Sequence, residues 1–147
     1  MDHDAFRDAR RTLNPRPCPF ERAILARCCG CSAATRLSIS ERETIACDDA
    51  AAQVGCEILG GELRQRSLFA LKAVPGAPLP HAKEMKAMCG GLLGLQRVIE
   101  GEAEDRSEVA DARALLQMAR ARYGALDALP FSEIVPSVAA FELRRRR

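Results

Sequence analysis

The chain has 147 residues, of which 48% are apolar and 29% are charged, and its formal net charge is +2. This length suits one ordinary globular domain and is too short for two well-formed ones, and the composition excludes a disordered chain. Four positive charges lie in the tail 144–147, so the remaining residues are slightly acidic, which argues against a surface that coats nucleic acid.

Aromatic residues are sparse: five Phe, one Tyr and no Trp. The interior must therefore be built mainly from aliphatic side chains, methionine and cysteine, which favours packed helices over a sheet. No segment alternates between apolar and polar residues over a convincing length. We expect an all-α fold, a small irregular bundle of about five helices organised around a cysteine-rich site. Residues 1–147 form one domain in this interpretation, with 1–17 as a polar lead-in and 144–147 as a basic tail.

The first third of the chain is predicted to be helical in three short pieces. A polar helix over residues 3–13 ends before a proline-rich stretch. Pro19 suits the first position of a second helix, which would run to about residue 30 with an apolar stripe that includes Cys28. Ser38 and Glu41 have the spacing of a capping box, which predicts a short helix ending near Cys47.

Longer helices are predicted in the rest of the chain. Asp48 and Asp49 are candidate caps for a helix over about 50–74, interrupted by two glycines. A helix from Pro80 to Ile99 carries three glycines that would allow another helix or an inorganic ligand to approach closely. Residues 109–123 show the strongest amphipathic pattern, and Gly124 is a natural stop. Pro136 is expected to break the last segment, leaving a brief helix over 138–143.

Six of the seven cysteines fall between Cys18 and Cys56. The N-terminus has no apolar stretch of the kind found in secretory signals, so we expect a cytoplasmic protein whose thiols stay reduced unless a metal binds them. An odd number of cysteines also argues against a closed set of disulfides. The crowding therefore predicts a metal site, although no diagnostic ligand motif is present.

The candidate metal ligands are six cysteines that would converge across the bundle. They are Cys18, Cys29, Cys31, Cys47, Cys56 and Cys89. Cys29-Gly30-Cys31 forms a local chelate, and Cys28 is an alternative to Cys29. An unbroken helix would separate Cys18 from Cys29 by about 16 Å, so both serve one site only if the segment bends.

The predicted cofactor is an iron–sulfur cluster, of the 4Fe–4S type, with zinc as the alternative. Structural zinc sites usually combine two close cysteine pairs, or cysteine and histidine, on small units, whereas these cysteines are spread over helices. For Cys56 and Cys89, a role as ordinary core residues is the alternative to metal ligation, because free cysteine is among the most buried residue types.

The expected function is that of a small electron carrier or an accessory subunit of a larger redox enzyme, rather than that of an enzyme itself. Its protein partner would carry an acidic patch that docks the tail 144–147. The alternative is a metal-free or zinc-stabilised helical adaptor that binds an acidic partner through the same tail. Residues 38–59 have the outline of a helix-turn-helix but few side chains that read bases. No apolar run is long enough for a membrane span.

Overall fold

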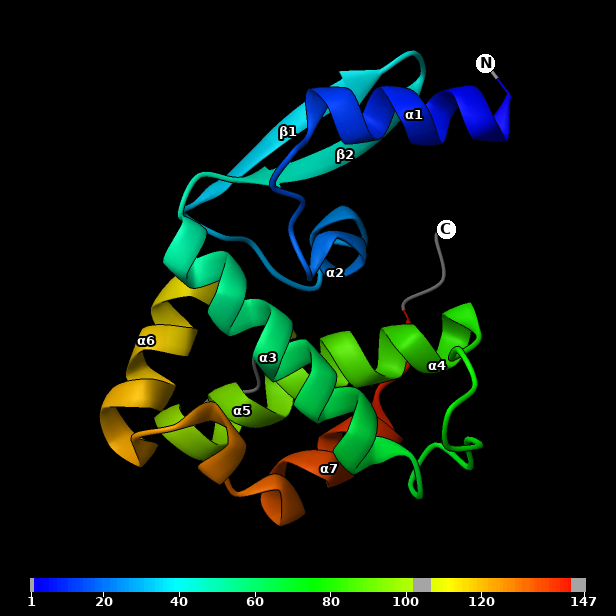
Figure 1. Ribbon diagram of the computed structural model, residues 1–147. Helices are drawn as coiled ribbons and strands as arrows, with labels where there is room; N and C mark the ends of the chain where they lie inside the picture. Colours follow the sequence, from blue (N-terminus) through cyan, green and yellow to red (C-terminus); the bar gives the residue numbers. More distant parts are fainter. Residues whose placement is uncertain (1, 102–106, 144–147) are drawn as a thin grey trace.

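The computed structural model of the protein describes residues 2–101 and 107–143. It has a mostly helical body, with an N-terminal helix and a two-stranded sheet at one end (Figure 1). The helices are α1 (His3–Leu13), α2 (Glu21–Leu25), α3 (Ala50–Ser67), α4 (His81–Met85), α5 (Gly91–Glu100), α6 (Ala112–Tyr123) and α7 (Phe131–Ala140), with a π-helical turn η1 (Lys86–Gly90) and a 3-10 turn η2 (Leu126–Ala128). The strands are β1 (Ala34–Ile39) and β2 (Arg42–Cys47).

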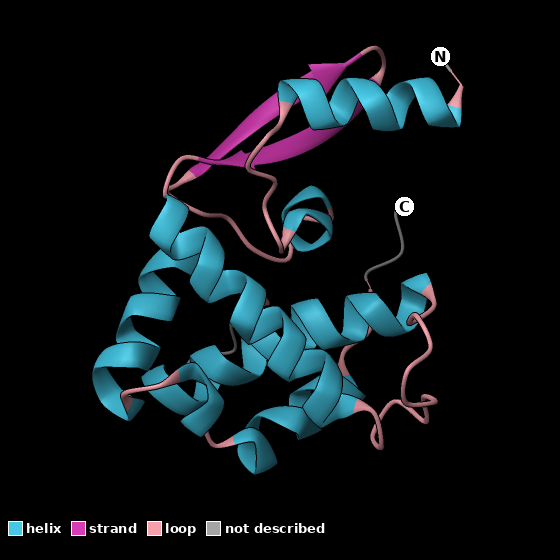
Figure 2. Ribbon diagram, viewed as in Figure 1, coloured by secondary structure: helices cyan, strands magenta, loops and turns pink. Residues whose placement is uncertain are grey.

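The all-α prediction is wrong, because residues 34–47 form an antiparallel hairpin where a short helix was expected (Figure 2). Ala34 lies opposite Cys47, and Ile39 lies opposite Arg42 across a two-residue loop. Ser40, in this loop, has a φ of 57°, which reverses the chain. The segment is rich in Thr and Ile, whose branched side chains fit a sheet better than a helix. Because residues 38–47 belong to this hairpin, the helix-turn-helix outline over residues 38–59 is also wrong.

The predicted polar helix over 3–13 is confirmed as α1, which begins at its cap Asp2. Asn14 ends it and is only 3% exposed. Its Nδ2 donates hydrogen bonds to Thr44 Oγ1 (3.1 Å) and to the Ile45 carbonyl (2.8 Å). The segment predicted to be a polar lead-in is thus fastened to β2 by buried hydrogen bonds.

Helix α2 is shorter than predicted, because it ends at Leu25. Arg27 follows with a φ of 63°, and the Cys28 amide donates to the Ala23 carbonyl (2.9 Å). These features turn the chain back before Cys29. The bend that a common site for Cys18 and Cys29 requires is therefore present.

Helix α3 begins where it was predicted to begin. The Asp49 side chain caps it by accepting from the Ala52 amide (3.0 Å), and the same carboxylate accepts from Arg113 Nε of α6 (2.9 Å). The Ala52 hydrogen bond, assisted by Arg113, holds the pKa of Asp49 below its usual value. The helix ends at Ser67, short of the predicted Val74.

The helix predicted from Pro80 to Ile99 is confirmed as the continuous run of α4, η1 and α5. Its glycine face is covered by α7. A Cβ atom at Gly90 would lie 2.6 Å from the Val138 Cα, and one at Gly94 would lie 2.7 Å from the Ile134 carbonyl oxygen. The close approach that the glycines allow is therefore made by a helix.

Helix α6 ends before Gly124, whose φ is 84°, as the sequence predicts. The prediction for the last segment is wrong, because α7 continues through Pro136. Ile134 and Val138 on either side of this proline are fully buried, and their burial against the glycine face offsets the hydrogen bond that proline lacks. The tail 144–147 lies outside the described residues. In the described part of the chain, no helix is long and apolar enough to cross a membrane.

Two helical glycines should respond in opposite directions to alanine. Gly94→Ala should lower the free energy of unfolding by about 1–3 kcal/mol, because its methyl group would overlap α7. Gly61→Ala in α3 should raise it by up to about 1 kcal/mol, because no atom lies within 4 Å of the added Cβ and alanine favours a helix. Urea denaturation measures both values. Equal effects at the two positions would contradict the packing of α5 against α7.

Candidate functional site

Five cysteines that take no part in a disulfide come together between the hairpin, α2 and α3. This thiol cluster consists of Cys18, Cys29, Cys31, Cys47 and Cys56. The thiols lie close enough for charge on one to affect another. Negative charge on Cys31 and Cys47 would raise the pKa of both Cys18 and Cys56, and charge on Cys18 and Cys56 would raise that of Cys29.

Backbone hydrogen bonds between two neighbouring segments place the first and fourth of these cysteines. The Cys18 amide donates to the Ile45 carbonyl (2.9 Å), and the Cys47 amide donates to the Arg16 carbonyl (2.8 Å). Residues 16–18 thus run beside β2. The Cys47 thiol donates to the Asp49 carbonyl (3.2 Å), at the start of the helix that carries Cys56.

The Cys29-Gly30-Cys31 loop is held by the segment before α6. The Gly30 amide donates to the Val109 carbonyl, and the Val109 amide donates to the Cys28 carbonyl, both at 2.9 Å. The Ser32 amide donates to the Asp111 carboxylate (2.9 Å). Burial raises the pKa of Asp111, but the hydrogen bonds that its carboxylate accepts, above all from Ser32, lower the pKa by more. The pKa of Asp111 therefore lies below its usual value. The loop is therefore held at both of its ends by residues 109–111, although residues 29–31 belong to no helix or strand.

Burial raises the pKa of Cys18, Cys29 and Cys56 to about 12, and repulsion from the neighbouring thiols adds to the effect. A metal ion reverses this balance, because its positive charge replaces the protons and removes the repulsion between thiolates. Metal-free, these three side chains are neutral thiols near pH 7. The thiol cluster is thus chemically suited to a cation that binds sulfur.

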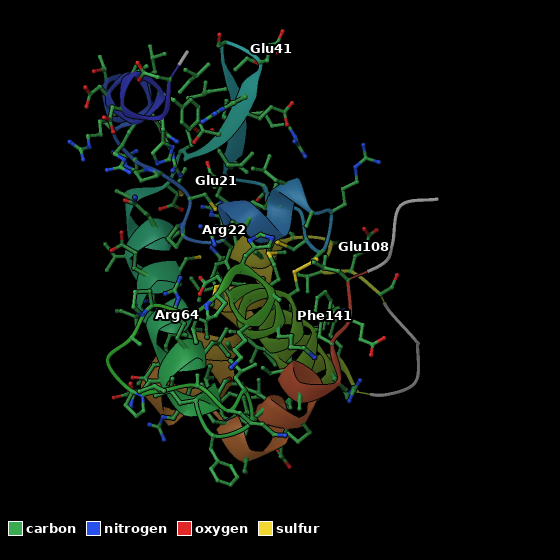
Figure 3. The ribbon with its side chains drawn as sticks, turned by 90° about the vertical axis from the view of Figure 1, so that its right-hand side faces the viewer. Glu21, Arg22, Glu41, Arg64, Glu108 and Phe141 are labelled. Carbon is green, nitrogen blue, oxygen red and sulfur yellow. A yellow bond between two sulfur atoms is a disulfide. The ribbon has the colours of Figure 1, made fainter. Side chains whose placement is uncertain are left out.

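Cys28 and Cys89 form a disulfide, with their Cα atoms 5.8 Å apart (Figure 3). The bond joins the bend after α2 to the π-helical turn η1, and both residues are buried. The sequence argued against disulfides and placed Cys89 among the ligands, but a sulfur in a disulfide is not available as a thiolate. Of the neighbours Cys28 and Cys29, the structure leaves Cys29 as the free thiol.

The thiols are neighbours without forming a finished metal site. Within the described ranges, no group of three or more His, Cys, Asp or Glu side chains stands in an arrangement that could hold a metal ion. The His3 ring hydrogen-bonds Arg7, and His81 is exposed at the start of α4. The site residues predicted from the sequence therefore separate into five gathered thiols and one disulfide-bonded cysteine, Cys89.

A pocket of about 530 Å³ opens beside Cys18, and sequence reasoning did not anticipate it. Its charged lining residues are Arg10, Glu21, Arg22, Arg64 and Glu84. They come from α1, α2, α3 and α4. No local motif connects these residues, because they come from four separate helices and only Glu21 and Arg22 are neighbours in the sequence.

Comparison of the chain with protein-family models, with curated proteins and with solved structures finds no match. The chemistry of the thiol cluster is therefore the basis for assigning a function.

The disulfide predicts how many cysteines react with iodoacetamide. Unfolded without a reductant, the protein should take up five carbamidomethyl groups, and after reduction it should take up seven, as mass spectrometry will show. Reduction should also lower the free energy of unfolding by about 4 kcal/mol, because the bond closes a loop with a sequence separation of 61 residues. Seven modified cysteines without reductant would contradict the Cys28–Cys89 bond.

The buried thiols predict that alkali destabilises the metal-free protein. Their pKa is about 12 in the folded chain and close to 9 in the unfolded chain, so above pH 9 the unfolded state loses protons first. Stability should therefore be fully present below pH 9 and should fall as the pH rises toward 12. Denaturation of Cys56→Ala over this range should give a shallower slope than the parent protein gives. An unchanged slope would show that the Cys56 thiol is not buried as described.

Proposed function

We propose that the protein binds an iron–sulfur cluster of the 4Fe–4S type through four of the five thiolates of the thiol cluster. In this proposal it acts in the cytoplasm as a small electron carrier or as an accessory subunit of a larger redox enzyme. The observation that carries the proposal is the meeting of five uncommitted cysteines from four separate segments of the chain. Four thiolates are the usual ligand set of such a cluster.

The donor atoms favour an iron–sulfur cluster over a metal site that combines cysteine with histidine. The groups whose charge acts on Cys29 are all thiols, and no histidine contributes. A zinc ion bound by four thiolates is the alternative that the same donors allow. In either case the sulfurs must move toward one another from their present positions, since they do not yet form a metal-holding group within the described residues. The hydrogen bond from Cys47 to the Asp49 carbonyl would be given up in that movement.

The exposure of the thiols suits electron exchange. Cys18, Cys31 and Cys47 are only partly buried, whereas Cys29 and Cys56 are 5% and 8% exposed. A cluster bound here would supply one-electron chemistry close to the protein surface, and burial of part of its ligand shell would tune its potential. A partner that docks over the partly buried thiols would bring its own redox centre near the cluster. The proposed partner is a redox enzyme with an acidic docking patch.

The decisive measurement is the iron and acid-labile sulfide content of protein purified without oxygen. We expect a brown protein whose absorption bleaches on reduction with dithionite. The double variant Cys31→Ser/Cys47→Ser should lose the iron and sulfide, because it leaves three free thiols, one fewer than the cluster requires.

The matched control is the double variant Cys28→Ser/Cys89→Ser, which removes two sulfurs outside the thiol cluster and should keep the metal while losing stability. Bound zinc without sulfide would replace the proposal with a structural zinc site. A colourless preparation without iron or zinc would refute it.

A further inference from the structure

The pocket beside Cys18 is built from residues distant in the sequence. It lies where α2 faces α3, and the loop 76–79 and α4 complete its wall (Figure 3). Its volume of about 530 Å³ is typical of pockets that hold small molecules. Three arginines and two glutamates line it, and no other lining residue carries a charge. The pocket therefore has a net charge of +1.

Both glutamates are committed to protein groups and hold two of the arginines in place. Glu21 is 13% exposed; it accepts from Arg10 and from the Ile45 amide (2.7 Å). Glu84 is also 13% exposed, and Arg64 binds it through Nε (3.0 and 3.1 Å) and through Nη2 (2.7 Å). These pairs fix the guanidinium planes and use up the negative charge, while Nη1 of Arg64 stays outside the pair.

Arg22 provides the uncompensated charge. In the described part of the chain its guanidinium makes no hydrogen bond or ion pair, and the residue is exposed on α2. Gly61 of α3 leaves open space at this wall, because a Cβ atom there would meet nothing within 4 Å. An unpaired guanidinium, a pre-oriented one and free space between helices are the features that recognise a small oxyanion.

We propose that this pocket binds a small organic anion bearing carboxylate or phosphate groups, held by Arg22 and Arg64 against Cys18. A planar guanidinium donates two parallel hydrogen bonds to either kind of group, so the recognition chemistry is shared. The apolar walls at Leu79 and Met88 leave room for a carbon skeleton. The pocket does not require the proposed metal function, although Cys18 belongs to both sites.

Binding is tested by isothermal titration calorimetry on the whole protein with two probes, citrate for the carboxylate class and pyrophosphate for the phosphate class. We expect at least one to bind, and the stronger probe identifies the class. Arg22→Gln should weaken that binding at least tenfold, because a hydrogen bond to a charged group is lost. Arg27→Gln is the matched control, since it removes the same charge from the same region outside the pocket. The affinity of Arg27→Gln for the probe should stay within twofold of the affinity of the parent protein.

Two further measurements separate a built site from general attraction to positive charge. Gly61→Leu fills the open space without changing any charge, and it should also weaken binding at least tenfold. The bound probe should slow alkylation of Cys18 but not that of Cys31, which lies outside the pocket wall.

The proposal is overturned if neither probe binds at millimolar concentration or if Arg22→Gln and Arg27→Gln weaken binding equally. It is also overturned if Gly61→Leu binds normally. Failure of the metal function is distinguishable, because Cys31→Ser/Cys47→Ser should lose iron and retain probe binding, whereas Arg22→Gln should retain iron.

Discussion

The carboxylate of Glu21 is the interaction on which the arrangement of the site depends. From the first residue of α2 it accepts hydrogen bonds from Arg10 of α1 and from Thr44 and Ile45 of β2. A single, largely buried charge thus joins α1, α2 and β2, and the last two border the thiols. It also sits in the wall of the pocket. Removal of its charge would leave Arg10 unpaired and would loosen the hairpin from α2, because partly buried charged groups depend on their partners.

The sequence predicted those elements whose signals are local and strong. Asp49 and Gly124 mark helix ends through capping and a positive φ, which act within a few residues, and both predictions were correct. The hairpin was missed because Ser38 and Glu41 imitate a capping box, although the branched Thr and Ile side chains of the same segment favour strands. The predicted helix break at Pro136 was wrong because the cost of the hydrogen bond that proline lacks acts locally. Burial of α7 against glycines more than 40 residues away in the chain outweighs this cost.

Cysteine density was informative about chemistry and uninformative about pairing. The count between Cys18 and Cys56 predicted a group of sulfurs, and in the structure the five free thiols are near enough for their charges to interact. No sequence signal showed that Cys28 would meet Cys89, because that contact arises only when the bend after α2 packs on η1. The pocket was invisible for the same reason: its arginines are ordinary surface residues until four helices converge.

The two proposed sites share Cys18, and this has an electrostatic consequence for the redox chemistry. An anion held by Arg22 and Arg64 would place negative charge beside a cluster ligand and so disfavour the addition of an electron to the cluster. The reduction potential would therefore be lower with the anion bound. By reciprocity, reduction of the cluster would weaken anion binding by the same factor. Arg10 and Arg64 are each paired with a glutamate, so the positive charge that a bound anion would neutralise belongs to Arg22. The unpaired Arg22 is therefore the residue through which anion binding and electron transfer would be linked.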